Sequence, residues 1–185
     1  MSMNQLHARP VAQVESHGIP EALHIDSESR PFARDFGAPG VDLQLLQADI
    51  EGGTFAVRIR FAPGVQLPPH HHSGIVFAYT LAGEWRYLEY PDSPRSVKGS
   101  YLYEPPGSIH TLKVSDDNTE LTDVIFVITG AMLILDDEHR VIQVLDAASH
   151  VNDWAQALRE QGDDVPTIIG GSRVGYITPQ IPRSR

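Results

Sequence analysis

Two prolines precede three consecutive histidines, His70, His71 and His72. In an extended strand, residues two apart share a face, so His70 and His72 can point to one side while His71 points to the other. His110 follows a Pro-Gly turn at the start of another expected strand and supplies a third imidazole. Three neutral imidazoles that converge on one point suit iron, zinc, copper or nickel. The sequence therefore predicts a metal site formed by His70, His72 and His110.

The composition limits the ligands and the partners of this site. Cysteine is absent, so any metal is held by nitrogen or oxygen, and disulfides and cysteine nucleophiles are excluded. Its absence also fits a reducing cytoplasm, the expected location. The formal net charge of -10 repels nucleic acids and anionic lipid surfaces. The longest apolar stretch, 121–135, is shorter than the roughly 20 residues of a membrane-spanning helix, so we expect no nucleic-acid or membrane partner.

The elements that must position the histidines are short strands. Apolar or alternating runs separated by Gly, Pro, Asn and Asp turns predict a β-sandwich or barrel. The runs cover residues 43–48, 54–61, 75–81, 84–90, 100–104, 109–114, 121–129, 131–135 and 141–145. One amphipathic helix is predicted over 147–160, behind the possible caps Asp146 and Ser149.

We interpret residues 1–185 as one domain. Residues 1–40 are rich in proline and lack periodicity, and are predicted to form an extended arm that is disordered or wraps a neighbouring subunit. Residues 41–146 form the barrel core, and residues 147–185 form the helix and a loosely attached tail. The arm makes a homodimer or homotetramer a reasonable expectation.

The two histidine segments resemble the two sequence motifs of the cupin superfamily, in the expected order. The matching positions are Gly64-x5-His70-x-His72 with Gly83 behind it, and Gly99-x5-Pro105-x-Gly107-x2-His110. This resemblance implies an all-β fold, the cupin double-stranded β-helix or jelly-roll barrel. It covers the middle of the chain and leaves the N-terminal arm and the C-terminal tail outside.

Two positions depart from the cupin pattern. Val76 stands where many cupins have a glutamate ligand, and Val114 stands where they have an asparagine. The resemblance then implies a metal held by three histidines without a carboxylate. A divalent ion with three neutral ligands keeps its full positive charge and favours an anionic, chelating substrate. Val76 and Ala78 are expected on the same inward face as His70 and His72, where they would make the pocket wall apolar and suited to an aryl group.

Within the superfamily, the chain is most similar to the 2,4'-dihydroxyacetophenone dioxygenases and also resembles the acetylacetone-cleaving dioxygenases. The closer likeness lies in residues 78–81, 85–90 and 100–105. It implies an Fe(II) enzyme that uses O2 to split a small aryl 2-hydroxyketone into two carboxylic acids. Zinc or another divalent metal is the alternative for the protein as purified. Glu104 would act as the general base, and Arg86 on a neighbouring strand would hold and tune it.

Other interpretations of these residues remain open. Glu104 has an alternative role as a strand residue paired with a surface Arg or Lys, and a register slip of one residue would turn Arg86 away from the cavity. His71 is expected to point outward. Tyr79, Tyr87, Tyr101 and Tyr103 are expected to pack in the barrel or an interface. The remaining histidines are expected to be solvated, and they are His7, His17, His24, His139 and His150.

Two other functions compete with the dioxygenase. One is a metal-binding sensor or regulatory cupin, like the zinc cupins of anti-sigma factors. Those carry an additional helical segment with His and Cys zinc ligands, and no such segment is evident here. The other is a zinc or manganese cupin isomerase, or a sugar-binding cupin. Such sites usually retain the carboxylate ligand that Val76 replaces.

Overall fold

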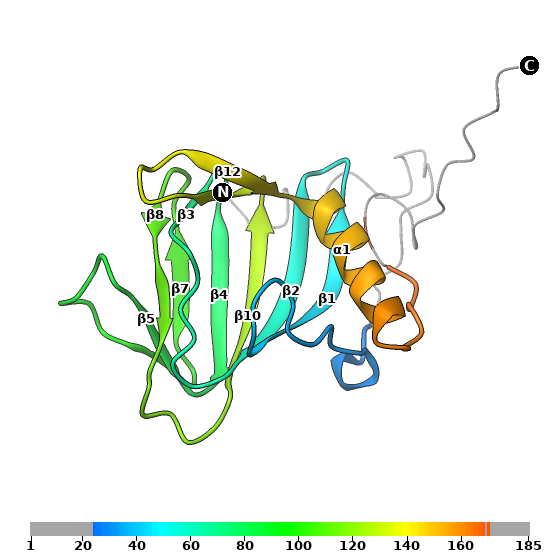
Figure 1. Ribbon diagram of the computed structural model, residues 1–185, viewed down its shortest axis with the longest axis horizontal. Coiled ribbons are helices and arrows are strands. Elements are labelled where there is room, and N and C mark those ends of the chain that lie inside the picture. Colours follow the sequence, from blue (N-terminus) through cyan, green and yellow to red (C-terminus); the bar gives the residue numbers. More distant parts are fainter. Residues whose placement is uncertain (1–23, 169, 171–185) are drawn as a thin grey trace, which may run out of the picture.

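Figure 1 shows the fold of residues 24–168 and residue 170, the part of the chain that the computed structural model describes. Short strands make up most of it, together with a short 3-10 helix, η3 (Ser27–Ser29), and one α-helix, α1 (Ala147–Glu160). The strands are β1 (Val41–Asp49), β2 (Thr54–Phe61), β3 (His70–His72), β4 (Val76–Ala82), β5 (Glu84–Tyr87), β6 (Ser96–Val97), β7 (Tyr101–Glu104), β8 (Ile109–His110), β9 (Leu112–Val114), β10 (Thr122–Thr129), β11 (Met132–Leu135) and β12 (Val141–Leu145).

Within the described residues, these strands form three antiparallel sheets. The largest has the order β1-β2-β10-β4-β7, the second β12-β11-β3-β8 and the third β6-β5-β9. Strands that are distant in the sequence are neighbours, since β10 pairs with both β2 and β4. In Figure 1 the largest sheet forms a curved wall, β12 crosses one end of it and α1 lies beside β1. The predicted all-β architecture with one C-terminal helix is confirmed.

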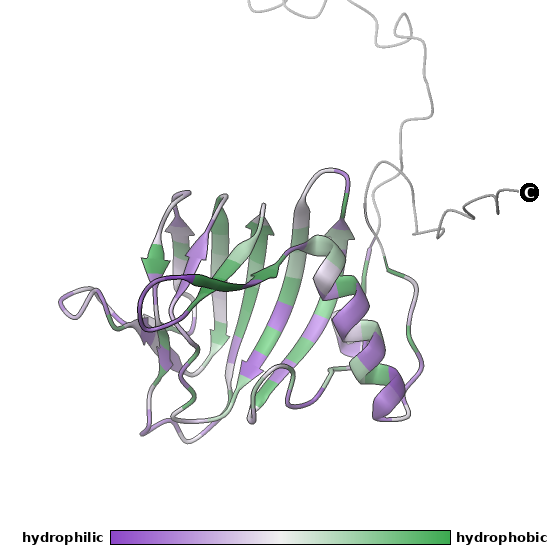
Figure 2. Ribbon diagram, turned by 45° about the horizontal axis from the view of Figure 1, so that its top comes forward, coloured by the Kyte–Doolittle hydropathy of each residue, from purple (hydrophilic) through white to green (hydrophobic). Residues whose placement is uncertain are grey.

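The strands alternate between the barrel interior and its surface, as their sequences predict. In β4, Val76 and Ala78 are buried while Phe77 and Tyr79 are exposed. In β5, Trp85 is fully buried and its indole N–H donates to Thr80 Oγ1 at 2.9 Å. Figure 2 shows this mixture of apolar and polar residues along the strands. The inward side chains form one hydrophobic core that fixes the strand register around the site.

Helix α1 has the bounds that the sequence predicts, because its signals are local. Asp146 is the N-cap and accepts a hydrogen bond from the Ser149 N–H, while the Ser149 hydroxyl accepts one from the Asp146 N–H. Trp154 and Leu158 on one face of the helix are fully buried, and α1 contacts β1 and β12. The helix therefore forms part of the wall at one end of the barrel.

The described part of the predicted arm packs on the barrel, and residues 1–23 lie outside the described residues. Ala33 exchanges two backbone hydrogen bonds with Leu43, at 2.8 and 2.9 Å. The buried Arg30 donates to the Thr167 carbonyl at 2.7 Å, which also anchors the start of the predicted tail. The described part of the arm is therefore ordered and packs on its own barrel, and the prediction of a loosely attached tail is wrong for its first residues.

Three of the four tyrosines noted above lie on the outer surface of the largest sheet. Tyr79, Tyr101 and Tyr103 are exposed, and Phe77 packs against Tyr101 and Tyr103. They do not pack inside the barrel, and the homodimer or homotetramer stays a prediction.

No helix within the described residues is both long and apolar enough to cross a bilayer.

Candidate metal centre

His70 and His72 point into the barrel from strand β3. The two prolines before His70 restrict the preceding backbone to extended conformations, which leads the chain into a strand. Both histidines are 3% exposed, whereas His71 between them is half-buried and pairs in register with the exposed Ile109. The predicted alternation of the three histidines is confirmed.

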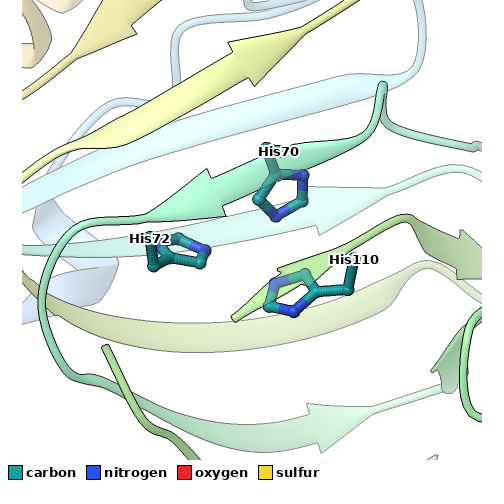
Figure 3. A group of neighbouring side chains, drawn as sticks. All are labelled: His70, His72 and His110. Atoms are coloured by element: carbon teal, nitrogen blue, oxygen red, sulfur yellow. The ribbon is translucent and has the colours of Figure 1, made fainter. Parts of the chain in front are cut away.

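His110 reaches the same point from the adjacent strand β8, where it lies directly opposite His70. The turn before it requires Gly107, whose φ of 88° strongly favours glycine. The Gly107 N–H donates to the His72 carbonyl at 2.8 Å, and the His72 N–H donates to the Ser108 carbonyl at 3.1 Å. These two hydrogen bonds hold the turn against β3. Figure 3 shows the three rings facing one another from the two strands.

The predicted strand 109–114 is divided at Thr111. Strand β8 pairs with β3, whereas β9 pairs with β5, so the chain passes from one sheet to another between them. The Thr111 N–H has no ladder partner there and donates to Glu89 Oε2 at 2.7 Å. This corner places His110 beside His70 and directs the following strand toward Tyr87.

The three histidines present one ligand atom each, and these atoms lie within 4.8 Å of one another. The His70 Nδ1 lies 2.9 Å from the Pro68 carbonyl oxygen. A carbonyl oxygen can only accept, so Nδ1 carries the proton and donates it, and the lone pair of Nε2 is free. Burial lowers the pKa of His70 and of His72 to about 4, so both rings are neutral at pH 7. Neutral imidazole is the form that binds metals.

Buried polar atoms without hydrogen bonds support the fit of a metal ion. Within the described residues they include His110 Nε2, His72 Nδ1 and Glu104 Oε2. Leaving such groups unpaired is costly, and a cation held by the histidines would satisfy the lone pair of His110 Nε2. The donor set of this site therefore fits a divalent transition metal.

Glu104 lies beside this cluster on β7, directly opposite Val76 of β4. Its side chain is 4% exposed, so the alternative role in a surface ion pair is wrong. Its Oε2 is 3.2 Å from His110 Nε2 and 3.5 Å from His72 Nε2, while the group of mutually close ligand atoms contains only the histidines. Glu104 thus borders the candidate metal position on one side. Burial alone would raise the pKa of this carboxyl, but the adjacent His110 and Tyr87 outweigh burial and lower it.

Tyr87, and not Arg86, is the residue that holds Glu104. The Tyr87 hydroxyl donates to Glu104 Oε1, and its ring stacks on His110 with 3.7 Å between the centroids. Arg86 lies on the opposite face of β5, is exposed and pairs in register with Lys113. The prediction that Arg86 tunes Glu104 is wrong. Adjacent residues of a strand face opposite sides, so the register that turns Tyr87 toward Glu104 turns Arg86 away from it. The pattern of Trp85-Arg86-Tyr87 contains this alternation, but the sequence does not reveal which face is inward.

A cavity of about 710 Å³ opens on one side of the histidines and includes His70 in its wall. Its other walls come from β1, β2, β11, β12, α1 and the segment 34–38 before β1, and include Phe36, Phe61, Ile134 and His150. This volume is in the range of small-molecule sites. Val76 and Ala78 are buried and inward-facing as expected, but they belong to the core and do not line this cavity. The prediction of an apolar pocket wall is therefore correct, but the prediction that Val76 and Ala78 form it is wrong.

The metal-free protein is expected to lose stability as the pH falls from about 6.5 to about 4. His70 and His72 have folded pKa values of about 4 against 6.5 for an ordinary histidine, so the unfolded chain binds more protons in this range. Each group contributes up to about 3 kcal/mol to this loss. Urea unfolding with a chelator at several pH values measures it. The double variant H70Q/H72Q should show a shallower dependence on pH, and an equal slope in both proteins would contradict the assignment.

Residues 21–133 match the ChrR cupin-like domain family. The chain belongs to this family. No curated protein is significantly similar to this chain. The cupin barrel that the two motifs predict is confirmed.

Solved structures share this cupin fold. A protein of unknown function with a cupin-like fold from Ralstonia eutropha JMP134 is 35% identical, with a TM-score of 0.76 over 85% of this chain and 96% of that one. An RmlC-like cupin from the same organism is 22% identical, with a TM-score of 0.74 over 83% and 96%. An acetylacetone dioxygenase from Acinetobacter johnsonii is 20% identical, with a TM-score of 0.63 over 76% and 95%. The last two similarities show the fold alone.

Proposed function

We propose that this protein is an Fe(II)-dependent dioxygenase that cleaves a small aryl 2-hydroxyketone. The bond between the carbonyl and carbinol carbons is broken, and one oxygen atom of O2 is added to each carbon. An aryl carboxylic acid and formic acid result, and no further reductant is needed. The observation that carries this proposal is the convergence of three buried imidazoles with a buried carboxylate beside them. One of the three, His70, also lines a largely apolar cavity.

His70, His72 and His110 would hold the metal. A bound Fe(II) would supply Lewis acidity toward the ketone and hydroxyl oxygens and electrons for the reaction with O2. Because the three ligands are neutral, the site favours a substrate that chelates as an anion. The cavity next to His70 supplies apolar surface for the aryl group, with Phe36 and Phe61 in its wall.

Glu104 is proposed as the base that removes a proton from the hydroxyketone. Its lowered pKa keeps the carboxylate ionised at neutral pH, which a base requires. Tyr87 occupies Oε1, so Oε2 is the oxygen left to accept the proton. The buried position of Glu104 excludes bulk water from this step, and Tyr87 is a positioning residue. Arg86 has no part in this mechanism.

The variant Tyr87→Phe is expected to keep the metal and lose roughly 10- to 100-fold in turnover, as found for residues that orient groups at metal sites. The ring and its stacking on His110 remain, while the hydrogen bond to Glu104 is lost. Because that bond stabilises the carboxylate, its loss raises the pKa of Glu104 and moves the acid limb of the pH–rate profile to higher pH. The control Tyr79→Phe changes an exposed hydroxyl on the outer surface. An unchanged profile in Tyr87→Phe would exclude the positioning role.

The similarity to the acetylacetone dioxygenase from Acinetobacter johnsonii supports a cupin dioxygenase as the general class. Oxygen consumption by the Fe(II)-loaded protein tests the proposal, with 2,4'-dihydroxyacetophenone as the first substrate and a panel of aryl 2-hydroxyketones and diketones as the comparison. Uptake confined to hydroxyketones supports it. Uptake only with 1,3-diketones assigns a different dioxygenase, and no uptake with any of them refutes the class.

The second candidate is a metal-binding regulatory domain, which the match to the ChrR cupin-like domain family favours. The chain lacks cysteine, which the zinc segments of such regulators use. A zinc or manganese isomerase is disfavoured by Val76, which removes the usual carboxylate ligand. Native zinc at one per chain, together with no effect of oxygen on any turnover, would favour these alternatives over the dioxygenase.

A further inference from the structure

His150 on helix α1 is buried beside the large cavity and differs from its sequence-based prediction. It was expected to be solvated, as the exposed His24 and His139 are, whereas His7 and His17 lie outside the described residues. Instead, His150 is 5% exposed and lines the same cavity as His70. Its ring stacks on Phe55 with 4.3 Å between the centroids, which fixes the plane of the imidazole.

The hydrogen bonds of His150 determine which nitrogen is free. Nδ1 lies 2.8 Å from the Asp146 carbonyl, which can only accept, so Nδ1 carries a proton and donates it. Burial lowers the pKa of the ring and keeps it neutral. Nε2 therefore carries a lone pair, and it makes no hydrogen bond within residues 24–168. The cavity wall thus contains an oriented acceptor at α1, in addition to the lone pair of His70 Nε2.

Three polar side chains that line the cavity near His150 differ from it in their access to water. Gln143, Asp153 and Gln156 also line it, but they are exposed and can be satisfied by solvent. A nearly buried acceptor gains more from a ligand donor, because leaving it unpaired beside an apolar group is costly. Sites of this kind discriminate strongly against an analogue that lacks the donor.

We propose that His150 is a specificity-determining residue whose Nε2 accepts a hydrogen bond from a hydroxyl on the substrate's aromatic ring. The ketone end lies toward His70, and the hydroxylated end of the ring lies toward α1. The cavity then selects hydroxyaryl ketones over plain aryl ketones. This assignment rests on the proposed function for the ketone class, and deepens it by naming the ring substituent.

Binding measured by calorimetry tests this assignment without turnover. The probes are 4-hydroxyacetophenone, 4-methoxyacetophenone and acetophenone, which share the ketone and differ in the donor. We expect the full-length protein to bind the hydroxy compound at least about tenfold more tightly than the other two. In H150F, which keeps an aromatic ring against Phe55 but lacks the acceptor, this preference should disappear. The control H24F changes an exposed histidine and should retain the preference.

Equal affinities for the three probes in the wild-type protein would overturn the assignment, and this result does not depend on whether H150F folds. A preference that persists in folded H150F, verified by its melting temperature, would overturn it too. The outcomes for the two proposals are separable. If the wild type is selective, H150F is not, and no oxygen is consumed, the dioxygenase is refuted and the role of His150 stands. If the wild type consumes oxygen but does not prefer the hydroxy compound, the role of His150 is refuted and the dioxygenase stands.

Discussion

Replacing His110 by alanine is expected to abolish metal binding and oxygen uptake together. His110 is 1% exposed, lies opposite His70 and supplies one of the three clustered ligand atoms. Its removal leaves two histidines, and the affinity for the metal should fall by more than the roughly 10- to 100-fold typical of outer-shell substitutions. Metal content after dialysis, measured by elemental analysis beside an oxygen electrode, records both losses.

His71 provides a matched control for this experiment because it lies on the same strand between two of the ligands. Its side chain belongs to the opposite face of β3, outside the cluster. His71→Ala should therefore retain the metal and the activity. Full retention of metal by the His110 variant would show that the ion binds elsewhere, and equal losses in both variants would point to general disruption of β3.

Glu104→Gln is the second large effect, and it is expected to separate metal binding from turnover. The amide has nearly the shape of the carboxylate and can still contact Tyr87, but it cannot take up the proton of the hydroxyketone. Turnover should fall by roughly 10²- to 10⁴-fold, the range attributed to general base catalysis. The metal content should match that of the wild type, because Glu104 is not part of the three-histidine cluster.

The control for this substitution is Glu84→Gln, which changes a carboxylate paired with Arg95 outside the cavity. It should leave turnover within a factor of about two, as surface ion pairs contribute little. Loss of the metal from Glu104→Gln would identify Glu104 as a fourth ligand. Normal turnover with bound metal would eliminate it as the base.

The features that the sequence predicted correctly are those encoded over a few residues. His70 and His72 share a face because side chains alternate along any strand, and Gly107 marks the turn before His110. The start of α1 follows from the reciprocal bonds of Asp146 and Ser149. Each of these features is determined by residues close together in the sequence and does not depend on contacts between elements.

The incorrect predictions depended on contacts between elements. Tyr87 and Arg86 are adjacent in β5, and only the pairing of β5 with β9 decides which one faces Glu104. His150 is buried because α1 docks with this residue against Phe55 of β2, an arrangement that helical periodicity does not specify. The same reason accounts for Ala33, whose pairing with Leu43 joins the arm to the barrel.

Cleavage of 2,4'-dihydroxyacetophenone under ¹⁸O2 by the Fe(II)-loaded protein tests the central claim most directly. Mass spectrometry should find one ¹⁸O atom in 4-hydroxybenzoate and one in formate, in equal amounts and with one O2 consumed per substrate. The His110→Ala protein should give neither product. Unlabelled acids, label in only one of them, or intact substrate with the metal fully bound would contradict a dioxygenase built on these three histidines.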